Sequence, residues 1–330
     1  MKILITGIHG FVGNNIVSRL KNQHTIFGLD IVSPIKDGVV KTYDWNELKK
    51  IPSIDCVIHL AGKAHDTKNQ TNPQVYFDIN TRLTQQIFDW FLTTNAQKFI
   101  FFSSVKAAAD QVDGDILTED VTPTPKGPYG ESKMAAEQYI LNHLPSIHFA
   151  TQGADFGLPS PVSGLRSSDK RVYILRPCMI HGPGNKGNLN LLYQVQQKGL
   201  PWPLGAYQNK RSFCAVDNLK FVIQQIIEKN IEPGIYQVAD DEALSTNELI
   251  QIMADSQNKK AKIWRVPPGL IKTLAHTGDF FHLPLNSERL KKLTESYVVS
   301  NQKLKTALGI EKMPVTAKEG LRKTLESFKE

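Results

Sequence analysis

The feature that most constrains the fold is a glycine-rich turn near the start of the chain, Thr6-Gly7-Ile8-His9-Gly10-Phe11-Val12-Gly13. It follows a short apolar run that predicts a strand, and it opens an apolar-periodic stretch that predicts a helix. Gly7 lets the chain reverse, Gly10 lets the backbone approach a pyrophosphate, and Gly13 lets the helix pack against the strand. The free N–H groups of the helix N-terminus favour an anion at the same place. The sequence therefore predicts a dinucleotide-binding turn that contains Gly7, Gly10, Phe11 and Gly13.

Short β-branched or aromatic runs alternate with helical patterns through the first half of the chain, which is typical of a parallel sheet covered by helices. The predicted strands are residues 2–6, 25–30, 39–43, 56–60, 98–103 and 172–176. The predicted helices among them are residues 11–21, 73–94 and 127–144. The pattern predicts an α/β fold, a Rossmann-type doubly wound parallel sheet that continues to about residue 177.

The rest of the chain reads as mostly helical, with short strand-like interruptions. Its predicted helices are residues 188–198, 217–229 and 246–254, and its short segments are residues 212–216 and 234–239. We expect residues 1–177 to form the dinucleotide-binding domain and residues 178–330 a smaller substrate-binding lobe, with the chain free to cross back between the two. Residues 147–170 are rich in Gly, Ser and Pro without periodicity, which predicts an insertion in the first domain.

The net charge of +7 is unevenly distributed. Residues 1–258 hold 24 Lys and Arg against 25 Asp and Glu, whereas residues 259–330 hold 15 against 7. No basic motif with interleaved aromatics accompanies the excess, so no nucleic-acid partner is expected. Three cysteines without metal-type spacing predict neither a disulfide framework nor a metal site. No apolar run approaches the ~20 residues of a membrane span, and none has the form of a signal peptide, so a cytoplasmic protein is expected.

Asp30 closes the second predicted strand, at the position where an acid can accept hydrogen bonds from an adenosine ribose diol. A carboxylate there repels a 2′-phosphate. The sequence therefore favours NAD as the cofactor and leaves NADP open.

Tyr129 and Lys133 are four positions apart on a predicted helix, so both side chains lie on one face of it. A free phenol has a pKa of about 10, and lowering it to near 7 takes roughly 4 kcal/mol of preferential stabilisation of the phenolate. The Lys133 ammonium and an oxidised nicotinamide together can supply it. Ser104, at the end of the fifth predicted strand, can donate a second hydrogen bond to the reacting oxygen.

The glycine spacing joined to Tyr129-Gly130-Glu131-Ser132-Lys133 resembles the extended short-chain dehydrogenase/reductases, and within them the NAD-dependent epimerase/dehydratase family. The resemblance covers almost the whole chain. It implies that Tyr129 is the proton donor or acceptor, that Lys133 is its partner and a ribose ligand, and that Ser104 orients the substrate. It further implies cofactor contacts from the loop after the fourth strand, the long helix and the ends of two strands: Leu60, Ala61, Lys63, Asn80, Ser103 and Pro177.

The same resemblance implies a nucleotide-sugar substrate. Asn188 and Arg211 match positions that hold the diphosphate or uridine in relatives, and Arg289 is a third candidate; arginine suits the bidentate contact that a diphosphate needs. Dehydratases of this branch carry an Asp-Glu pair after the fifth strand, where this chain reads Ser103-Ser104-Val105-Lys106-Ala107, which disfavours dehydration. The resemblance therefore favours reduction at C4 of a UDP-4-keto-6-deoxy sugar by NAD(P)H, in surface-polysaccharide biosynthesis.

Two alternatives stay open. A 4-epimerase of a UDP-hexose or UDP-N-acetylhexosamine would use the same residues and retain its NAD. A non-catalytic NAD-binding sensor or scaffold would have no need of the intact tyrosine and lysine. Peripheral membrane contact through the apolar positions 270, 271, 274, 280 and 281 is not expected, because apolar residues at helical spacing more often form core or subunit contacts. The resemblance also implies a homodimer, paired through the helices at 73–94 and 127–144.

Overall fold

Seven short runs of buried residues form one parallel sheet in the computed structural model, which describes residues 1–64, 72–144, 170–185, 188–281 and 286–329. The spatial order of the strands is β3-β2-β1-β4-β5-β6-β9. All six neighbouring pairs are parallel. Their bounds are β1 Lys2–Thr6, β2 Thr25–Leu29, β3 Lys41–Tyr43, β4 Cys56–His59, β5 Lys98–Phe102, β6 Arg171–Pro177 and β9 Gly234–Val238. The Rossmann-type doubly wound sheet predicted from the sequence is thereby confirmed.

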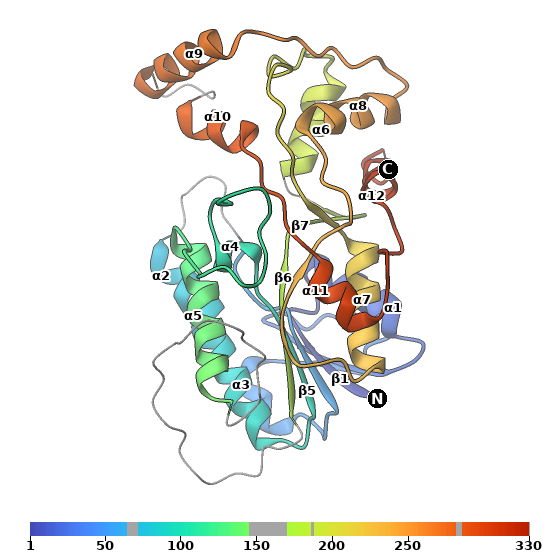
Figure 1. Ribbon diagram of the computed structural model, residues 1–330. Coiled ribbons are helices and arrows are strands. Elements are labelled where there is room, and N and C mark those ends of the chain that lie inside the picture. The colour runs from blue at the N-terminus through green and yellow to red at the C-terminus, as the bar shows by residue number, and fades with distance from the viewer. Residues whose placement is uncertain (65–71, 145–169, 186–187, 282–285, 330) are drawn as a thin grey trace.

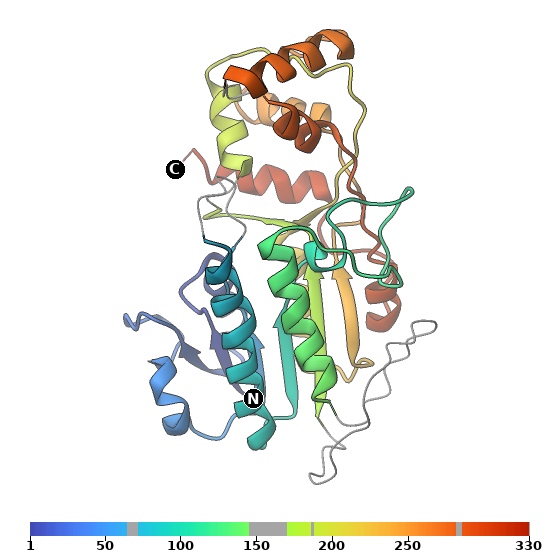
Figure 2. The ribbon, with the colours of Figure 1, turned by 90° about the vertical axis from the view of Figure 1, so that its left-hand side faces the viewer.

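Helices cover both faces of this sheet (Figures 1 and 2). On one face, α1 (Phe11–Leu20) packs against α7 (Val216–Glu228), and α11 (Gln302–Leu308) packs against β9. Figure 2 shows α3 (Leu83–Thr93) and α5 (Pro128–Asn142) side by side across the other face. Because side chains alternate along a strand, Ile3 and Ile5 enter the apolar cluster under α7, whereas Leu4 enters the cluster under α3.

The helix predicted over residues 73–94 is interrupted in the structure. It begins as α2 (Pro73–Tyr76), passes through a π-helical stretch η2 (Phe77–Arg82) and continues as α3. A π-helical stretch shifts the direction of the side chains that follow it and is frequent at functional sites. Asn80 lies inside η2 and is fully buried.

The remaining elements form a lobe beyond the carboxyl ends of the strands (Figure 1). Two short parallel strands, β7 (Met179–His181) and β8 (Phe213–Ala215), connect it to the sheet. Its helices are α6 Asn188–Gln197, α8 Thr246–Ser256, α9 Pro268–Phe281, α10 Ser287–Thr294 and α12 Ala317–Glu326.

Outside this lobe, two further short helices lie in the first half of the chain, η1 Trp45–Lys50 and α4 Val105–Ala108.

The chain crosses back from this lobe to the sheet, as the sequence allowed. After β8, helix α7 returns to pack beside α1, and β9 then adds the seventh strand beside β6. The division at residue 177 stays a prediction, and residues 147–169 of the predicted insertion lie outside the described residues. Among the described residues, no helix is both long and apolar enough to cross a bilayer.

Candidate active site

The three residues predicted to carry the chemistry come together at the carboxyl end of β5. Ser104 lies two residues after the end of that strand and caps α4, where its Oγ accepts a hydrogen bond from the Lys106 N–H at 3.2 Å. Tyr129 lies in the first turn of α5, and a hydrogen bond with the Ser104 side chain lowers the pKa of its phenol. Burial raises that pKa by more, so the phenol of the protein without ligands is held protonated. A cation beside the phenol is therefore needed before it can exchange a proton near neutral pH.

Lys133 is the cation that the helix places nearby. Its side chain is buried, and its Nζ donates a hydrogen bond to the Phe102 carbonyl oxygen at 2.8 Å. Burial lowers the pKa of the ammonium to about 8, although the negative charge of Glu137 acts to raise it. The ammonium also lies next to the backbone of Gly62, since a Cβ added there would come within 3.1 Å of Nζ. Lys133 thus joins the end of β5 to the loop that follows β4.

Asn80 fixes that loop from the other side. Its Oδ1 accepts from the Lys63 N–H at 2.8 Å, and its Nδ2 donates to the Lys63 carbonyl at 3.2 Å and to Ser132 Oγ at 3.0 Å. The neighbouring Thr81 donates to the Ser132 carbonyl at 2.9 Å. The π-helical stretch therefore binds both the loop after β4 and the first turns of α5, which keeps Lys133 and the loop in one arrangement.

A buried ion pair that sequence reasoning missed lies beneath this site. Arg176, on β6, donates from Nε to Glu137 Oε1 at 3.0 Å, and both side chains are at most 2% exposed. The Ser103 hydroxyl donates to the same carboxylate. Glu137 lies one helical turn beyond Lys133, so the spacing Tyr-x-x-x-Lys-x-x-x-Glu on α5 was the available signal. Ser103, predicted to contact the cofactor, is thus engaged by Glu137.

Tyr76 is a second residue that sequence reasoning missed. It is buried at the end of α2, and its ring meets that of Tyr129 edge to face with centroids 6.2 Å apart. The contact brings α2 against the start of α5 and limits the positions open to the Tyr129 ring. Tyr76 lies far from Tyr129 in the sequence and forms no recognisable pattern with it, so only the fold could bring the two rings together.

The glycine-rich turn has the geometry that a pyrophosphate requires. Gly7 has a φ of +65°, and a Cβ there would lie 2.8 Å from the Ala61 nitrogen. A Cβ at Gly13 would lie 2.6 Å from the Gly7 and Ile8 carbonyl oxygens, whereas one at Gly10 would meet only the Gly7 carbonyl at 3.2 Å. No side chain caps α1 at Gly10, which leaves its first-turn N–H groups available to an anion. These residues fit a dinucleotide.

Asp30 is held where its carboxylate can accept hydrogen bonds from the hydroxyls of a ribose. Its Oδ2 accepts from the His9 N–H of the glycine-rich turn at 3.0 Å, and its Oδ1 accepts from Ile31 N–H at 2.8 Å. Lys36 lies close enough for the Asp30 charge to raise the pKa of its ammonium, although burial lowers that pKa by more. A cation next to the carboxylate lessens the repulsion of a 2′-phosphate, so the geometry of Asp30 agrees with NAD without excluding NADP.

The other predicted cofactor residues surround the same edge of the sheet. Phe11, in the first turn of α1, lies 3.5 Å from the position of a Cβ added at Gly182, after β7. Ala61 donates its N–H to Thr6 Oγ1 at 3.0 Å, which binds the loop after β4 to the end of β1. Leu60 starts that loop, and Pro177 ends β6 beside Val238 of β9. Their contacts with a cofactor stay predictions.

The predicted substrate residues belong to the C-terminal lobe. Asn188 begins α6, and Arg289 lies exposed on α10. Arg211 precedes β8, and its Nη1 donates to the Lys292 carbonyl of α10 at 2.8 Å. The structure therefore brings Arg211 to the helix that carries Arg289. A contact with a substrate stays a prediction for all three residues.

Two histidines near the site have structural roles. His59, at the end of β4, lies between Thr6 Oγ1 at 2.7 Å and Thr84 Oγ1 at 2.9 Å, and burial lowers its pKa to about 3, so it stays neutral. His181 is fully buried, with its Nδ1 2.9 Å from Thr324 Oγ1 of α12. Both side chains are buried and hydrogen-bonded to threonine hydroxyls, which fits packing roles.

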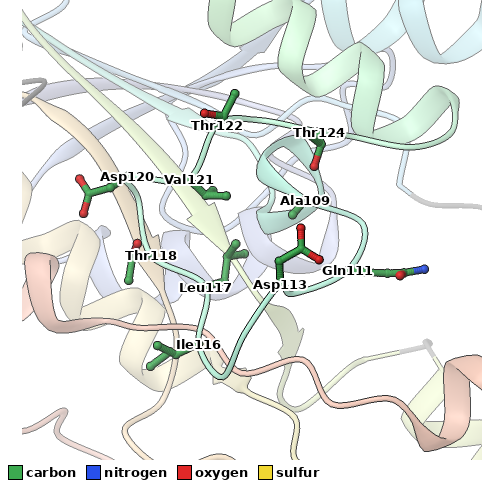
Figure 3. Close-up of a pocket in the computed structure, with 10 residues that line it drawn as sticks. All are labelled: Ala109, Gln111, Asp113, Ile116, Leu117, Thr118, Asp120, Val121, Thr122 and Thr124. Carbon is green, nitrogen blue, oxygen red and sulfur yellow. The ribbon is translucent and has the colours of Figure 1, made fainter. Parts of the chain in front are cut away.

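A solvent-open hollow of about 500 Å³ lies in the loop between Ser104 and Tyr129 (Figure 3). Every residue that lines it lies between Ala109 and Thr124 of this one loop, and its wall mixes acids such as Asp113 and Asp120 with Leu117 and Val121. The lining does not include Ser104, Tyr129 or Lys133. The chemistry is therefore assigned to the end of β5 and α5 rather than to this hollow.

Comparisons with known proteins agree with the resemblance and with the cofactor predicted from the sequence. Residues 3–152 match the NAD dependent epimerase/dehydratase family, which confirms the resemblance predicted from the sequence. The family is described as NAD dependent, in agreement with the cofactor that the sequence favoured.

Individual relatives extend the similarity to the whole chain. A UDP-glucose 4-epimerase of Vibrio cholerae is 28% identical over 99% of this chain and 95% of its own length. A GDP-6-deoxy-D-mannose reductase of Pseudomonas aeruginosa is 23% identical over 81% of this chain and 83% of its own. The crystal structure of the UDP-glucose 4-epimerase of Thermus thermophilus in complex with NAD superposes with a TM-score of 0.71, at 22% identity, over 100% of this chain and 99% of that one. The fold is thus that of a nucleotide-sugar epimerase/dehydratase-type enzyme.

Proposed function

We propose that this protein is an NAD(P)-dependent oxidoreductase that acts at C4 of a UDP-hexose or UDP-N-acetylhexosamine, and that its reaction is the reduction of a UDP-4-keto-6-deoxy sugar. The observation that carries the proposal is the single arrangement of Ser104, Tyr129 and Lys133 at the carboxyl end of β5. The adjacent Val105-Lys106-Ala107 contains no acid pair, which disfavours dehydration. The GDP-6-deoxy-D-mannose reductase among the relatives supports reduction as the direction.

The residues present divide the work of such a reduction. A bound nicotinamide in its reduced form would supply hydride to C4. Tyr129 gives its phenolic proton to the C4 oxygen as negative charge develops there, and Ser104 donates a hydrogen bond to that oxygen and orients it. Lys133 stabilises the phenolate that remains, and its hydrogen bond to the Phe102 carbonyl holds the ammonium in place.

The cofactor and substrate groups are assigned to separate parts of the site. Gly7, Gly10, Phe11 and Gly13 would surround the pyrophosphate, and Asp30 would accept from the ribose hydroxyls. The other cofactor contacts are assigned to Leu60, Ala61, Lys63, Asn80, Ser103 and Pro177. The nucleotide diphosphate is assigned to Asn188, Arg211 and Arg289, because amide and guanidinium groups suit phosphate oxygens.

A 4-epimerase is the second candidate, because the Vibrio cholerae relative and the Thermus thermophilus structure both carry that name. An epimerase would oxidise C4 with retained NAD and then let the keto sugar rotate in the site. The hydride would return to the opposite face of C4. The same three catalytic residues serve both reactions. A sensor or scaffold without chemistry is disfavoured, since the buried Lys133 and its partners are all retained.

The experiment that separates these functions begins with mass spectrometry of the ligand released from the denatured, purified protein, followed by incubation with a panel of UDP-sugars. Exchangeable NAD(P)H consumed by a UDP-4-keto sugar would support the reductase. Stoichiometric bound NAD, with C4 inverted and no net consumption, would support the epimerase. Binding of NAD without hydride transfer to any sugar nucleotide would contradict both and favour the sensor.

We also propose a cytoplasmic homodimer. The outer sides of the α2–α3 segment and of α5, which lie next to each other on one face of the sheet, would form the interface (Figure 2). A mass of twice 37.0 kDa by light scattering would support this assembly.

A further inference from the structure

Helix α9 carries large apolar side chains that the fold leaves in solvent. Leu270 is 54% exposed, Leu274 51%, Phe280 78% and Phe281 63%. Only Ile271, Ala275 and Gly278 of this helix are buried, on the side that packs against the lobe. The sequence had favoured core or subunit contact for these apolar positions. The exposure excludes a core position for the four large ones.

The exposed side chains share one side of the helix. With 3.6 residues per turn, positions 270, 274 and 281 fall in one row along α9, and position 280 lies in the next row. The rings of Phe280 and Phe281 meet edge to face with centroids 5.0 Å apart, so they form a single aromatic projection at the end of the helix. We call these four residues, Leu270, Leu274, Phe280 and Phe281, the α9 stripe.

The α9 stripe lies at the outer end of the molecule. Figures 1 and 2 both show α9 at the limit of the C-terminal lobe, away from the sheet and from the end of β5. Trp264, shortly before the helix, is also 58% exposed. A flat surface can therefore reach the stripe without meeting the catalytic residues.

The charge around the stripe is strongly positive. Residues 259–296 hold eight Lys and Arg against three Asp and Glu. All eight basic residues are exposed, and they lie on α9, on α10 that packs against it, or on the segment leading into α9: Lys259, Lys260, Lys262, Arg265, Lys272, Arg289, Lys291 and Lys292. A hollow of about 400 Å³ at the end of α6 is lined by three of them together with Lys198.

The combination of exposed apolar side chains and positive charge fits an anionic bilayer better than a second copy of this chain. Exposed Leu, Phe and Trp next to a surplus of Lys and Arg are the features of a helix that lies in the interface of an anionic bilayer. A two-fold contact between copies of this chain would bring the same basic surface against itself, and the like charges would repel. The charge therefore argues against a second copy as the occupant of the stripe.

We propose that the α9 stripe and the basic residues around it bind the surface of an anionic lipid bilayer, with the four apolar side chains inserted among the acyl chains and the lysines at the lipid phosphates. Such binding would hold the protein at the membrane with the C-terminal lobe between the bilayer and the carboxyl edge of the sheet. The proposal does not depend on which sugar the enzyme uses.

The test is co-sedimentation of the whole protein with vesicles of phosphatidylcholine containing about 30% phosphatidylglycerol, compared with vesicles of phosphatidylcholine alone. We expect binding to the anionic vesicles at low salt and loss of that binding at high salt, because screening weakens the contribution of the lysines. The double variant F280S/F281S should bind at least about tenfold more weakly, since it loses two inserted aromatic rings.

The matched control is Ile116→Ser, which removes another half-exposed apolar side chain, in the loop that follows α4. It should bind vesicles like the unchanged protein, and thermal melting should show that both variants fold. Absence of sedimentation with anionic vesicles at low salt would overturn the proposal, as would equal binding by the double variant. A concentration-dependent dimer that F280S/F281S abolishes would also overturn it, in favour of a subunit interface at α9.

Discussion

The carboxyl edge of the sheet and the outer end of the C-terminal lobe place their charges in opposite ways. At the sheet edge, Lys133, Glu137 and Arg176 are buried, and each has a defined partner. At the end of the lobe, the eight basic residues between 259 and 292 are exposed. A buried charge must be paired and hydrogen-bonded to be tolerated, whereas an exposed one is solvated wherever it points. Fixed geometry, suited to chemistry, is therefore found at the sheet edge, and an adaptable electrostatic surface at the end of the lobe.

The same contrast holds for the apolar side chains. Those of β1, β4 and β5 are buried between two layers of helices, because a parallel sheet is covered on both faces. Helix α9 is covered by other elements on one side only, so the large apolar side chains on its other side are exposed to solvent. Three substitutions in the sheet region test this contrast. Each is compared with a matched substitution in the C-terminal lobe.

The largest effect is expected from Tyr129→Phe. It removes the proton donor while keeping the ring against Tyr76, so kcat should fall by about 10²- to 10⁴-fold, with NAD binding unchanged. The matched change in the lobe, Arg211→Gln, should mainly raise KM for the nucleotide sugar, because it removes binding rather than proton transfer. Steady-state kinetics with the substrate found by the UDP-sugar panel, and NAD titration by fluorescence, measure both. Unchanged turnover in Tyr129→Phe would show that its assigned role is wrong.

A smaller but still large effect is expected from Glu137→Gln. It leaves the buried Arg176 guanidinium without its carboxylate partner, which should lower the free energy of unfolding by about 3–5 kcal/mol. Its match in the lobe is Glu288→Gln, which breaks the exposed pair with Lys292 and should cost less than about 1 kcal/mol. Urea denaturation of both variants gives the two free energies. Similar losses of unfolding free energy in the two variants would contradict the view that the buried ion pair matters more to stability than the exposed one.

The smallest of the three effects is expected from Gly13→Ala. Its Cβ would lie 2.6 Å from two backbone carbonyl oxygens, so the overpacked turn should lose roughly 1–3 kcal/mol of stability and bind NAD more weakly. Gly269→Ala, in the first turn of α9, has open space for its Cβ and should be neutral or slightly stabilising. Thermal melting with and without NAD distinguishes the two. A Gly13→Ala protein that melts and binds NAD like the unchanged one would mean that the turn relaxes without cost.

The sheet could be predicted from the sequence because its signals are local. Six strands were predicted with bounds that differ from the structure by at most two residues at either end, and the glycine-rich turn lies between β1 and α1 as expected. Tyr129 and Lys133 could be paired because their four-residue spacing fixes their side chains on one face of α5. β9 was seen only as a short segment of the second part, since its place beside β6 depends on a return of the chain that no local pattern encodes.

The sequence by itself determined the doubly wound sheet, the family resemblance and the three residues assigned to the chemistry, since periodicity and spacing along one strand or helix carry that information. Only the tertiary structure decided that Arg176 pairs with Glu137 beneath Lys133, that Tyr76 meets Tyr129, and that Asn80 bridges a loop and α5. It also decided that the apolar residues of α9 face solvent although their spacing suits a core helix. Burial is set by what the rest of the chain places on each side of an element, and local sequence does not contain that.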